Sequence, residues 1–130
     1  MRKVALLVLV LAGTVFCKSD IATSTSALIS HVDFMTSTSE FRNHAHPGTL
    51  DAVANYIDSV FSIYTNRVNR QVFEVGDDTY QNVIASFGPA LGERVIIGAH
   101  YDVCYDQPGA DDNASGVAAL LEIAAMLSKE

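Results

Sequence analysis

Hydrophobic residues recur at helical spacing in two stretches of the N-terminal half of the chain. The first stretch predicts a short amphipathic helix from about Ser26 to Met35. The second begins at Leu50 and repeats apolar residues at i, i+3, i+4 and i+7 as far as Tyr64, which makes it the clearest amphipathic helix in the sequence. Thr49 precedes it and is a candidate N-cap.

The hydrophobic period changes in the second half. Val68–Val75 and Thr79–Phe87 are rich in β-branched and aromatic residues and flank the turn cluster Gly76–Asp78, which predicts a β-hairpin. Val95–Ala99 is an uninterrupted apolar run of the kind that forms a strand covered on both faces. Val117–Leu127 predicts an apolar helix with little exposed face. A buried strand, a loop and a buried helix form a crossover unit, which indicates an α/β fold rather than a bundle or a sandwich.

The N-terminus has a short basic start followed by an uncharged apolar run, Val4–Cys17. This layout predicts a signal peptide over residues 1–17 and an exported, periplasmic or extracellular, mature chain over residues 18–130. The run is too short for a membrane-spanning helix, which needs about 20 apolar residues. Lipid anchoring through Cys17 is the less favoured alternative, because Phe16 stands where that processing requires a small residue.

Composition narrows the classes of partner. The chain has 130 residues, which corresponds to one domain at most, and 49% of them are hydrophobic, enough to build a core. Its 8 basic and 15 acidic residues give a net charge of -7, and no basic cluster follows the N-terminus. Nucleic acids and anionic membrane surfaces are therefore excluded as expected partners. Two cysteines cannot form the disulfide framework of a small secreted scaffold.

Candidate chemistry lies in the loop between the predicted buried strand and the last helix. His100 and four aspartates fall within the 13 residues that end at Asp112. Ligand sites of open α/β sheets lie beyond the carboxyl ends of the strands, which is where this loop begins. Carboxylates brought so close together repel one another unless a cation neutralises them. The loop is therefore a candidate metal site.

The spacing suggests a role for each side chain. In an extended segment His100 and Asp102 point to the same side, so that the carboxylate can bind the ring nitrogen that faces away from a metal. Asp112 lies near the start of the helix and, with His100, offers one oxygen and one nitrogen ligand to zinc. Alternatively, Asp111–Asn113 is a helix N-cap cluster. A calcium loop is less favoured, because the aspartates lack alternate spacing and histidine does not suit a hard cation.

The remaining histidines and the second cysteine are weaker candidates. His44 and His46 are interpreted as part of a loop that leads into a helix rather than as a metal pair. His31 is expected on the solvated side of the first helix. Cys104 is either a partly buried structural thiol or a residue near the metal site.

The combination of His100-Tyr101-Asp102, the segment Pro108–Gly116 and an Ala/Leu-rich helix that contains Glu122 resembles the two-zinc aminopeptidase family of the bacterial leucyl aminopeptidase type. The resemblance covers roughly residue 28 to the end. It implies the N-terminal part of a three-layer α/β/α domain with a mixed, mainly parallel sheet, in which two helices and a hairpin precede the buried strand and the buried helix.

By the same resemblance, His100 is a terminal ligand of one zinc, Asp112 bridges two zinc ions, and Asp102 orients the histidine. A cis peptide is implied between Asp112 and Asn113. The implied reaction is hydrolysis of the N-terminal bond of a peptide with a free N-terminus, with two zincs activating a bridging hydroxide and a glutamate shuttling the proton.

The family pattern also requires a Glu-Glu pair, an Asp and a His further along the chain. Glu122 does not replace them, because it lies nearly three helical turns beyond Asp112. We therefore expect residues 18–130 to be the N-terminal portion of a zinc peptidase domain, unable by itself to hold two zincs tightly or to catalyse. Stoichiometric zinc together with turnover of an aminoacyl-anilide would contradict this expectation.

Two other functional classes remain open. Glutaminyl cyclases, which are acyltransferases, share the fold but use one zinc, and the segment Asp111–Gly116 favours the peptidase. A non-catalytic peptidase-like binding module, as in transferrin-receptor ectodomains, is disfavoured by the presence of both His100 and Asp112, since such a module has no need for a costly acidic cluster.

Overall fold

The computed structural model describes residues 23–129, and the predicted signal peptide and Cys17 lie outside this range. The elements follow in the order α1 (Thr25–Thr36), α2 (Pro47–Tyr64), β1 (Val68–Val75), β2 (Asp78–Ala85), the short kinked turn η1 (Ala110–Ala114) and α3 (Ser115–Leu127). Helices combined with a sheet confirm the α/β class. Within the described range, no helix is both long enough and apolar enough to cross a membrane.

The two predicted N-terminal helices form almost where periodicity places them. The hydroxyl of Ser24 caps α1 by accepting a hydrogen bond from the backbone N–H of Ala27 at 3.2 Å. Helix α2 begins at Pro47, so the prediction of Thr49 as its N-cap is wrong. Proline suits the first helical position because its fixed φ is helical and it lacks an N–H that would be left without a partner.

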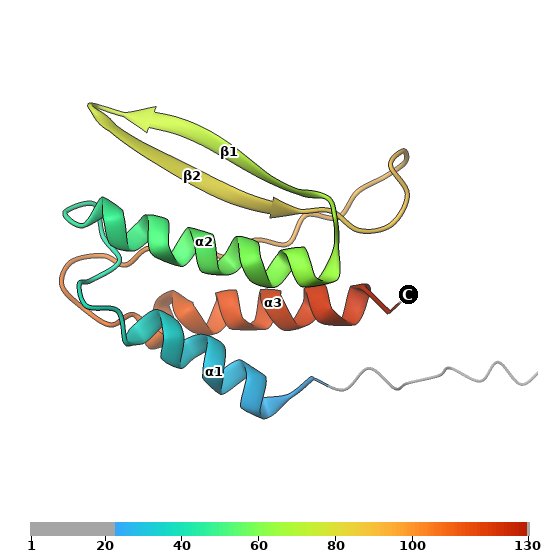
Figure 1. Cartoon of the computed structure of the whole chain (residues 1–130), viewed down its shortest axis with the longest axis horizontal. Helices are drawn as coiled ribbons and strands as arrows, with labels where there is room; N and C mark the ends of the chain where they lie inside the picture. The colour runs from blue at the N-terminus through green and yellow to red at the C-terminus, as the bar shows by residue number, and fades with distance from the viewer. Residues whose placement is uncertain (1–22, 130) are drawn as a thin grey trace, which may run out of the picture.

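The predicted hairpin is confirmed, although its second strand ends at Ala85 and not at Phe87. Strands β1 and β2 pair antiparallel from Val68 opposite Ala85 to Val75 opposite Asp78. Gly76 occupies the turn with a φ of 65°, a conformation that favours glycine. The hairpin lies along α2 on the side away from α3 (Figure 1).

Helix α3 lies between α1 and α2 and supplies much of the core (Figure 1). The core is helical and is made by apolar residues of α1, α2, η1 and α3: Met35, Val53, Ile57, Val60, Phe61, Ala114, Val117, Ala118, Leu121 and Ala124. Full burial of a Val or Leu side chain contributes about 1.5–3 kcal/mol. This packing fixes the start of α3, and with it the end of the loop that carries the candidate ligands.

The prediction of a buried strand over Val95–Ala99 is wrong in this structure. The segment forms no strand, and Val95 and Ile96 are 89% and 93% exposed. The physical reason is the lack of a neighbour, because the sheet within residues 23–129 consists of β1 and β2 alone. A strand needs a hydrogen-bonded partner, so the expected parallel sheet is not present in the described part of the chain.

His31 is not solvated, contrary to the expectation. Its Nδ1 lies 2.6 Å from the hydroxyl of Tyr56 on α2, and its Nε2 lies 3.7 Å from the carboxylate of Glu122 on α3. The other oxygen of Glu122 accepts a hydrogen bond from the backbone N–H of Ser24 at 3.0 Å. His31 therefore faces α2 and α3, and a partly buried polar cluster joins the three helices.

Candidate metal centre

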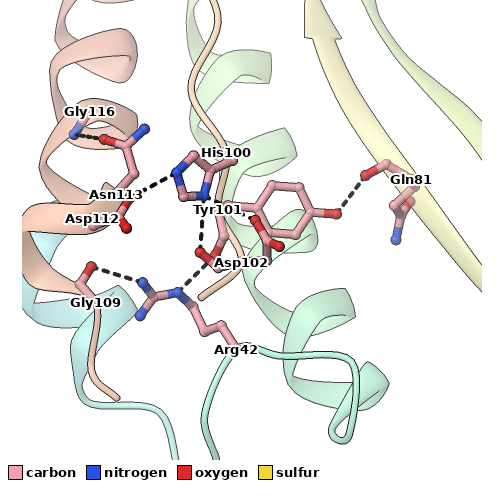
Figure 2. A network of polar contacts seen from close by, with 9 residues as sticks. All are labelled: Arg42, Gln81, His100, Tyr101, Asp102, Gly109, Asp112, Asn113 and Gly116. Carbon is pink, nitrogen blue, oxygen red and sulfur yellow. Dashed lines mark hydrogen bonds and ion pairs between the residues drawn. The ribbon is translucent and has the colours of Figure 1, made fainter. Parts of the chain in front are cut away.

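The structure brings together the three residues that the sequence singles out. Nε2 of His100 lies 3.0 Å from Oδ1 of Asp112, and Nδ1 lies 3.0 Å from Oδ1 of Asp102 (Figure 2). Asp102 thus binds the ring nitrogen that faces away from Asp112. The imidazole is held between two carboxylates that come from the two ends of one loop.

The environment of His100 favours a positively charged site. Partial burial lowers its pKa, but hydrogen bonds and charge attraction from Asp102, with a further attraction from Asp112, outweigh that effect and raise the pKa above its usual value. Nδ1–H of His100 donates a hydrogen bond to Asp102, and Nε2 on the opposite edge of the ring points toward the Asp112 carboxylate. A cation bound between Nε2 and the Asp112 carboxylate would take the place of the Nε2 proton.

The donor set fits zinc in kind. An imidazole nitrogen and a carboxylate oxygen are ordinary zinc ligands, and a carboxylate on the second ring nitrogen is the usual support for a metal-bound histidine. The His100 side chain is 52% exposed, so an ion can reach it from solvent. Over residues 23–129, no group of three or more His, Cys, Asp or Glu side chains is arranged to hold an ion. The described residues therefore offer two of the four ligands that zinc normally takes.

Local backbone geometry presents Asp112 to the histidine. Gly109 takes a φ of 60°, and a Cβ at that position would meet a side-chain carbon of Val103 at 2.1 Å. Asp112 has non-helical φ and ψ within η1, and its peptide bond to Asn113 is cis, as the resemblance implies. The side-chain oxygen of Asn113 accepts a hydrogen bond from the backbone N–H of Gly116 at 3.2 Å, which anchors this turn to α3.

Two buried polar residues near the centre are missed by sequence reasoning. Arg42 and Asn43 are 1% and 3% exposed, although the segment between α1 and α2 carries no apolar period that would predict burial. Asn43 donates to the carbonyl of Tyr105 at 3.0 Å and to the carboxylate of Asp106 at 3.1 Å. In the sequence these residues are an Arg-Asn pair in an irregular stretch between two amphipathic helices, and nothing in that pattern predicts that they are buried.

Tyr101 is a further residue that the sequence does not identify. Its hydroxyl donates to the carbonyl of Gln81 at 2.6 Å and so ties the residue between His100 and Asp102 to β2 (Figure 2). Burial, assisted by the charges of Asp51 and Asp102, raises the pKa of Tyr101. The hydroxyl consequently stays protonated and remains a donor at neutral pH.

The weaker candidates are Cys104, His44 and His46. Cys104 is an exposed free thiol and not a partly buried structural residue. His44 is exposed, whereas His46 stands immediately before α2 with its Nε2 3.7 Å from the carboxylate of Glu40. The interpretation of these two histidines as part of a loop that leads into a helix is confirmed.

Comparison with known proteins relates part of the chain to a peptidase family. The chain is 42% identical over 107 residues to the uncharacterized protein YfbL of Escherichia coli (strain K12). The match covers 76% of this chain and 33% of YfbL, so the chain spans about a third of the length of that curated relative. No solved structure matches the chain significantly. Residues 82–130, which contain His100, Asp102 and Asp112, match Peptidase family M28, and this match supports a relationship to zinc peptidases of the aminopeptidase type.

Proposed function

We propose that this chain contributes part of a two-zinc site to an exported exopeptidase that removes residues from the N-terminus of peptides. The observation that carries the proposal is the convergence of His100 and Asp112 at 3.0 Å, with Asp102 on the opposite ring nitrogen, inside the segment that matches a peptidase family. In this proposal His100 is a terminal ligand, Asp112 is the bridging carboxylate, and Asp102 orients His100.

Each of these residues has a defined task. Asp102 accepts a hydrogen bond from Nδ1–H of His100, so that Nε2 is the ring nitrogen that would bind an ion in place of its proton. Asp112 has two carboxylate oxygens, as a bridging ligand requires, and its side chain is 73% exposed. When bound, zinc would polarise the scissile carbonyl and lower the pKa of a water nucleophile.

Zinc titration of the complete 130-residue chain, followed by NMR of the histidine side chains, tests the site. We expect zinc to shift the His100 resonances first, and the variants His100→Gln and Asp112→Asn to weaken zinc binding by at least about tenfold. His44→Gln removes an exposed histidine outside the cluster and is the matched control. Zinc binding that His100→Gln and Asp112→Asn leave unchanged would disprove the site.

An aminoacyl-anilide assay addresses the activity. We expect no turnover by the chain with added zinc, because residues 23–129 contain no set of three candidate ligands close enough to share an ion. Turnover that disappears in Asp112→Asn would show that the site is complete, and it would contradict the assignment of a partial metal centre.

A further inference from the structure

We propose that Arg42 is a positioning residue that holds the two halves of the candidate metal centre at a fixed distance from each other. The part of this inference that concerns zinc rests on the proposed function, whereas the contacts that carry it are independent of any metal.

The Arg42 guanidinium binds both halves of the loop. Its Nε donates to the carbonyl of Tyr101, which lies between His100 and Asp102, at 2.8 Å. On the other side, Nη1 donates to the carbonyl of Pro108 at 2.8 Å. Nη2 donates to the carbonyl of Gly109 at 3.1 Å, directly before the turn that carries Asp112 (Figure 2). A single planar group therefore joins the backbone next to His100 to the backbone next to Asp112.

The backbone of Arg42 strengthens this connection. Its carbonyl accepts a hydrogen bond from the N–H of Val103 at 2.7 Å, and its Nη1 also donates to the carbonyl of Met35 at the end of α1. Residues 100–109 form no helix or strand, so their polar groups depend on partners elsewhere. Arg42 supplies several of these partners and connects the loop to the helical core.

The chemistry of the side chain suits this task. A guanidinium has five N–H donors in a rigid plane, whereas an ammonium is a compact group on a flexible stem and cannot reach separate carbonyls in a fixed geometry. Burial lowers the pKa of Arg42, and the charge of Asp102 opposes that shift. The cation thus lies near the carboxylate that orients His100, although it donates to backbone carbonyls.

A purely structural arginine would affect the stability of the fold without changing the relation between His100 and Asp112. The test therefore compares Arg42→Lys with Arg67→Lys in the full chain. Arg67 donates to the carbonyl of Gly88 at 2.6 Å, which makes it an arginine–carbonyl contact away from the candidate centre. Competition with a chelator measures the zinc affinity. NMR of the metal-free chain records the Nδ1–H signal of His100, and circular dichroism and urea denaturation report on folding.

We expect Arg42→Lys to retain the helical spectrum, to bind zinc at least about tenfold more weakly and to broaden or lose the His100 Nδ1–H signal. Arg67→Lys should match the unmodified chain in both measurements. A folded Arg42→Lys with an unchanged zinc affinity and an unchanged His100 signal would overturn the inference. If the unmodified chain binds no zinc at His100, that result concerns the proposed metal site and not Arg42, whose role is then decided by the metal-free His100 signal.

Gly109→Ala is the second variant, for the case in which Arg42→Lys does not fold. The added methyl group would lie 2.1 Å from a side-chain carbon of Val103, 2.7 Å from the backbone oxygen of Asp112 and 3.1 Å from Nη2 of Arg42, so this end of the loop must shift relative to Arg42. We expect weaker zinc binding with the His100–Asp102 hydrogen bond retained. An unchanged zinc affinity in Gly109→Ala would also overturn the inference.

Discussion

Two histidines show how neighbouring groups decide the chemistry of the same side chain. Desolvation by burial lowers the pKa of His31, and the nearby Glu122 only partly offsets this effect. His100 is more exposed, and the hydrogen bonds and charge of Asp102, aided by Asp112, outweigh its desolvation and raise its pKa. The folded protein therefore favours neutral His31 and protonated His100.

These opposite shifts predict opposite pH dependences of stability. Because the pKa of His31 is lower in the folded than in the unfolded chain, the unfolded chain binds more protons, and the stabilisation by neutral His31 is lost as pH falls through 6.5 toward the folded-state pKa. The raised pKa of His100 acts in the other direction, since its contribution is complete below the unfolded value of 6.5 and is lost as pH rises through the folded-state pKa.

We expect His31→Gln to remove the first dependence. The free energy of unfolding of the unmodified chain, minus that of His31→Gln, should rise with pH between the folded-state pKa of His31 and about 6.5 and should be flat above this range. Urea denaturation from pH 5 to pH 8 measures the difference, and His44→Gln, at an exposed position, should follow the unmodified chain. A difference that falls with rising pH would contradict the assigned environment of His31.

At the scale of elements, the start of α3 is adapted to the turn before it. Gly116 lies in the first turn of the helix, where a Cβ would approach the side-chain oxygen of Asn113 to 2.1 Å. The backbone N–H of Gly116 donates to that same oxygen. Glycine is required at this position by the close approach of Asn113, not by a left-handed backbone.

Gly116→Ala and Gly48→Ala should therefore have opposite effects on stability. Gly48 lies in the first turn of α2, and a Cβ added there would have no other atom within 4 Å, so alanine should stabilise the chain by about 0.4–1 kcal/mol through the unfolded state. Gly116→Ala should destabilise it by about 1–3 kcal/mol, because Asn113 must move and the hydrogen bond is lost. Urea denaturation of both variants checks the prediction. If the two alanine substitutions stabilised the chain equally, the prediction would be refuted.

At the scale of the whole molecule, two apolar segments that look alike in the sequence have different environments. Leu121 of α3 is completely buried among the helices, whereas Ile96 is 93% exposed. The sequence pattern predicts burial for both segments. What separates them is the presence of packing partners in the described chain, which α3 finds on α1 and α2.

We expect Ile96→Lys to change the free energy of unfolding by no more than about 0.5 kcal/mol, since an exposed side chain contributes little burial. Leu121→Ala should cost about 2–5 kcal/mol, because it leaves a cavity in the core. Both values come from urea denaturation of the full chain. A loss of several kcal/mol in Ile96→Lys would show that residues 95–97 are buried after all, as the sequence pattern predicts.

The features that depend on neighbouring residues could be predicted from the amino-acid sequence. Periodicity located α1, α2 and α3 and the hairpin to within a few residues, because helices and hairpins are governed by local spacing and turn chemistry. The grouping of His100, Asp102 and Asp112 was also predictable, since the first two share one side of an extended segment and the third lies at the start of the next helix.

Burial and the contacts between distant segments could not be predicted from the sequence, because they follow from how the elements pack. Arg42 contacts backbone 59 to 67 residues further along the chain, and His31 meets Tyr56 and Glu122 on two other helices. Such contacts leave no period or spacing in the sequence, because they depend on how whole elements pack. For the same reason an apolar run such as Val95–Ala99 forms a strand only where another strand lies beside it.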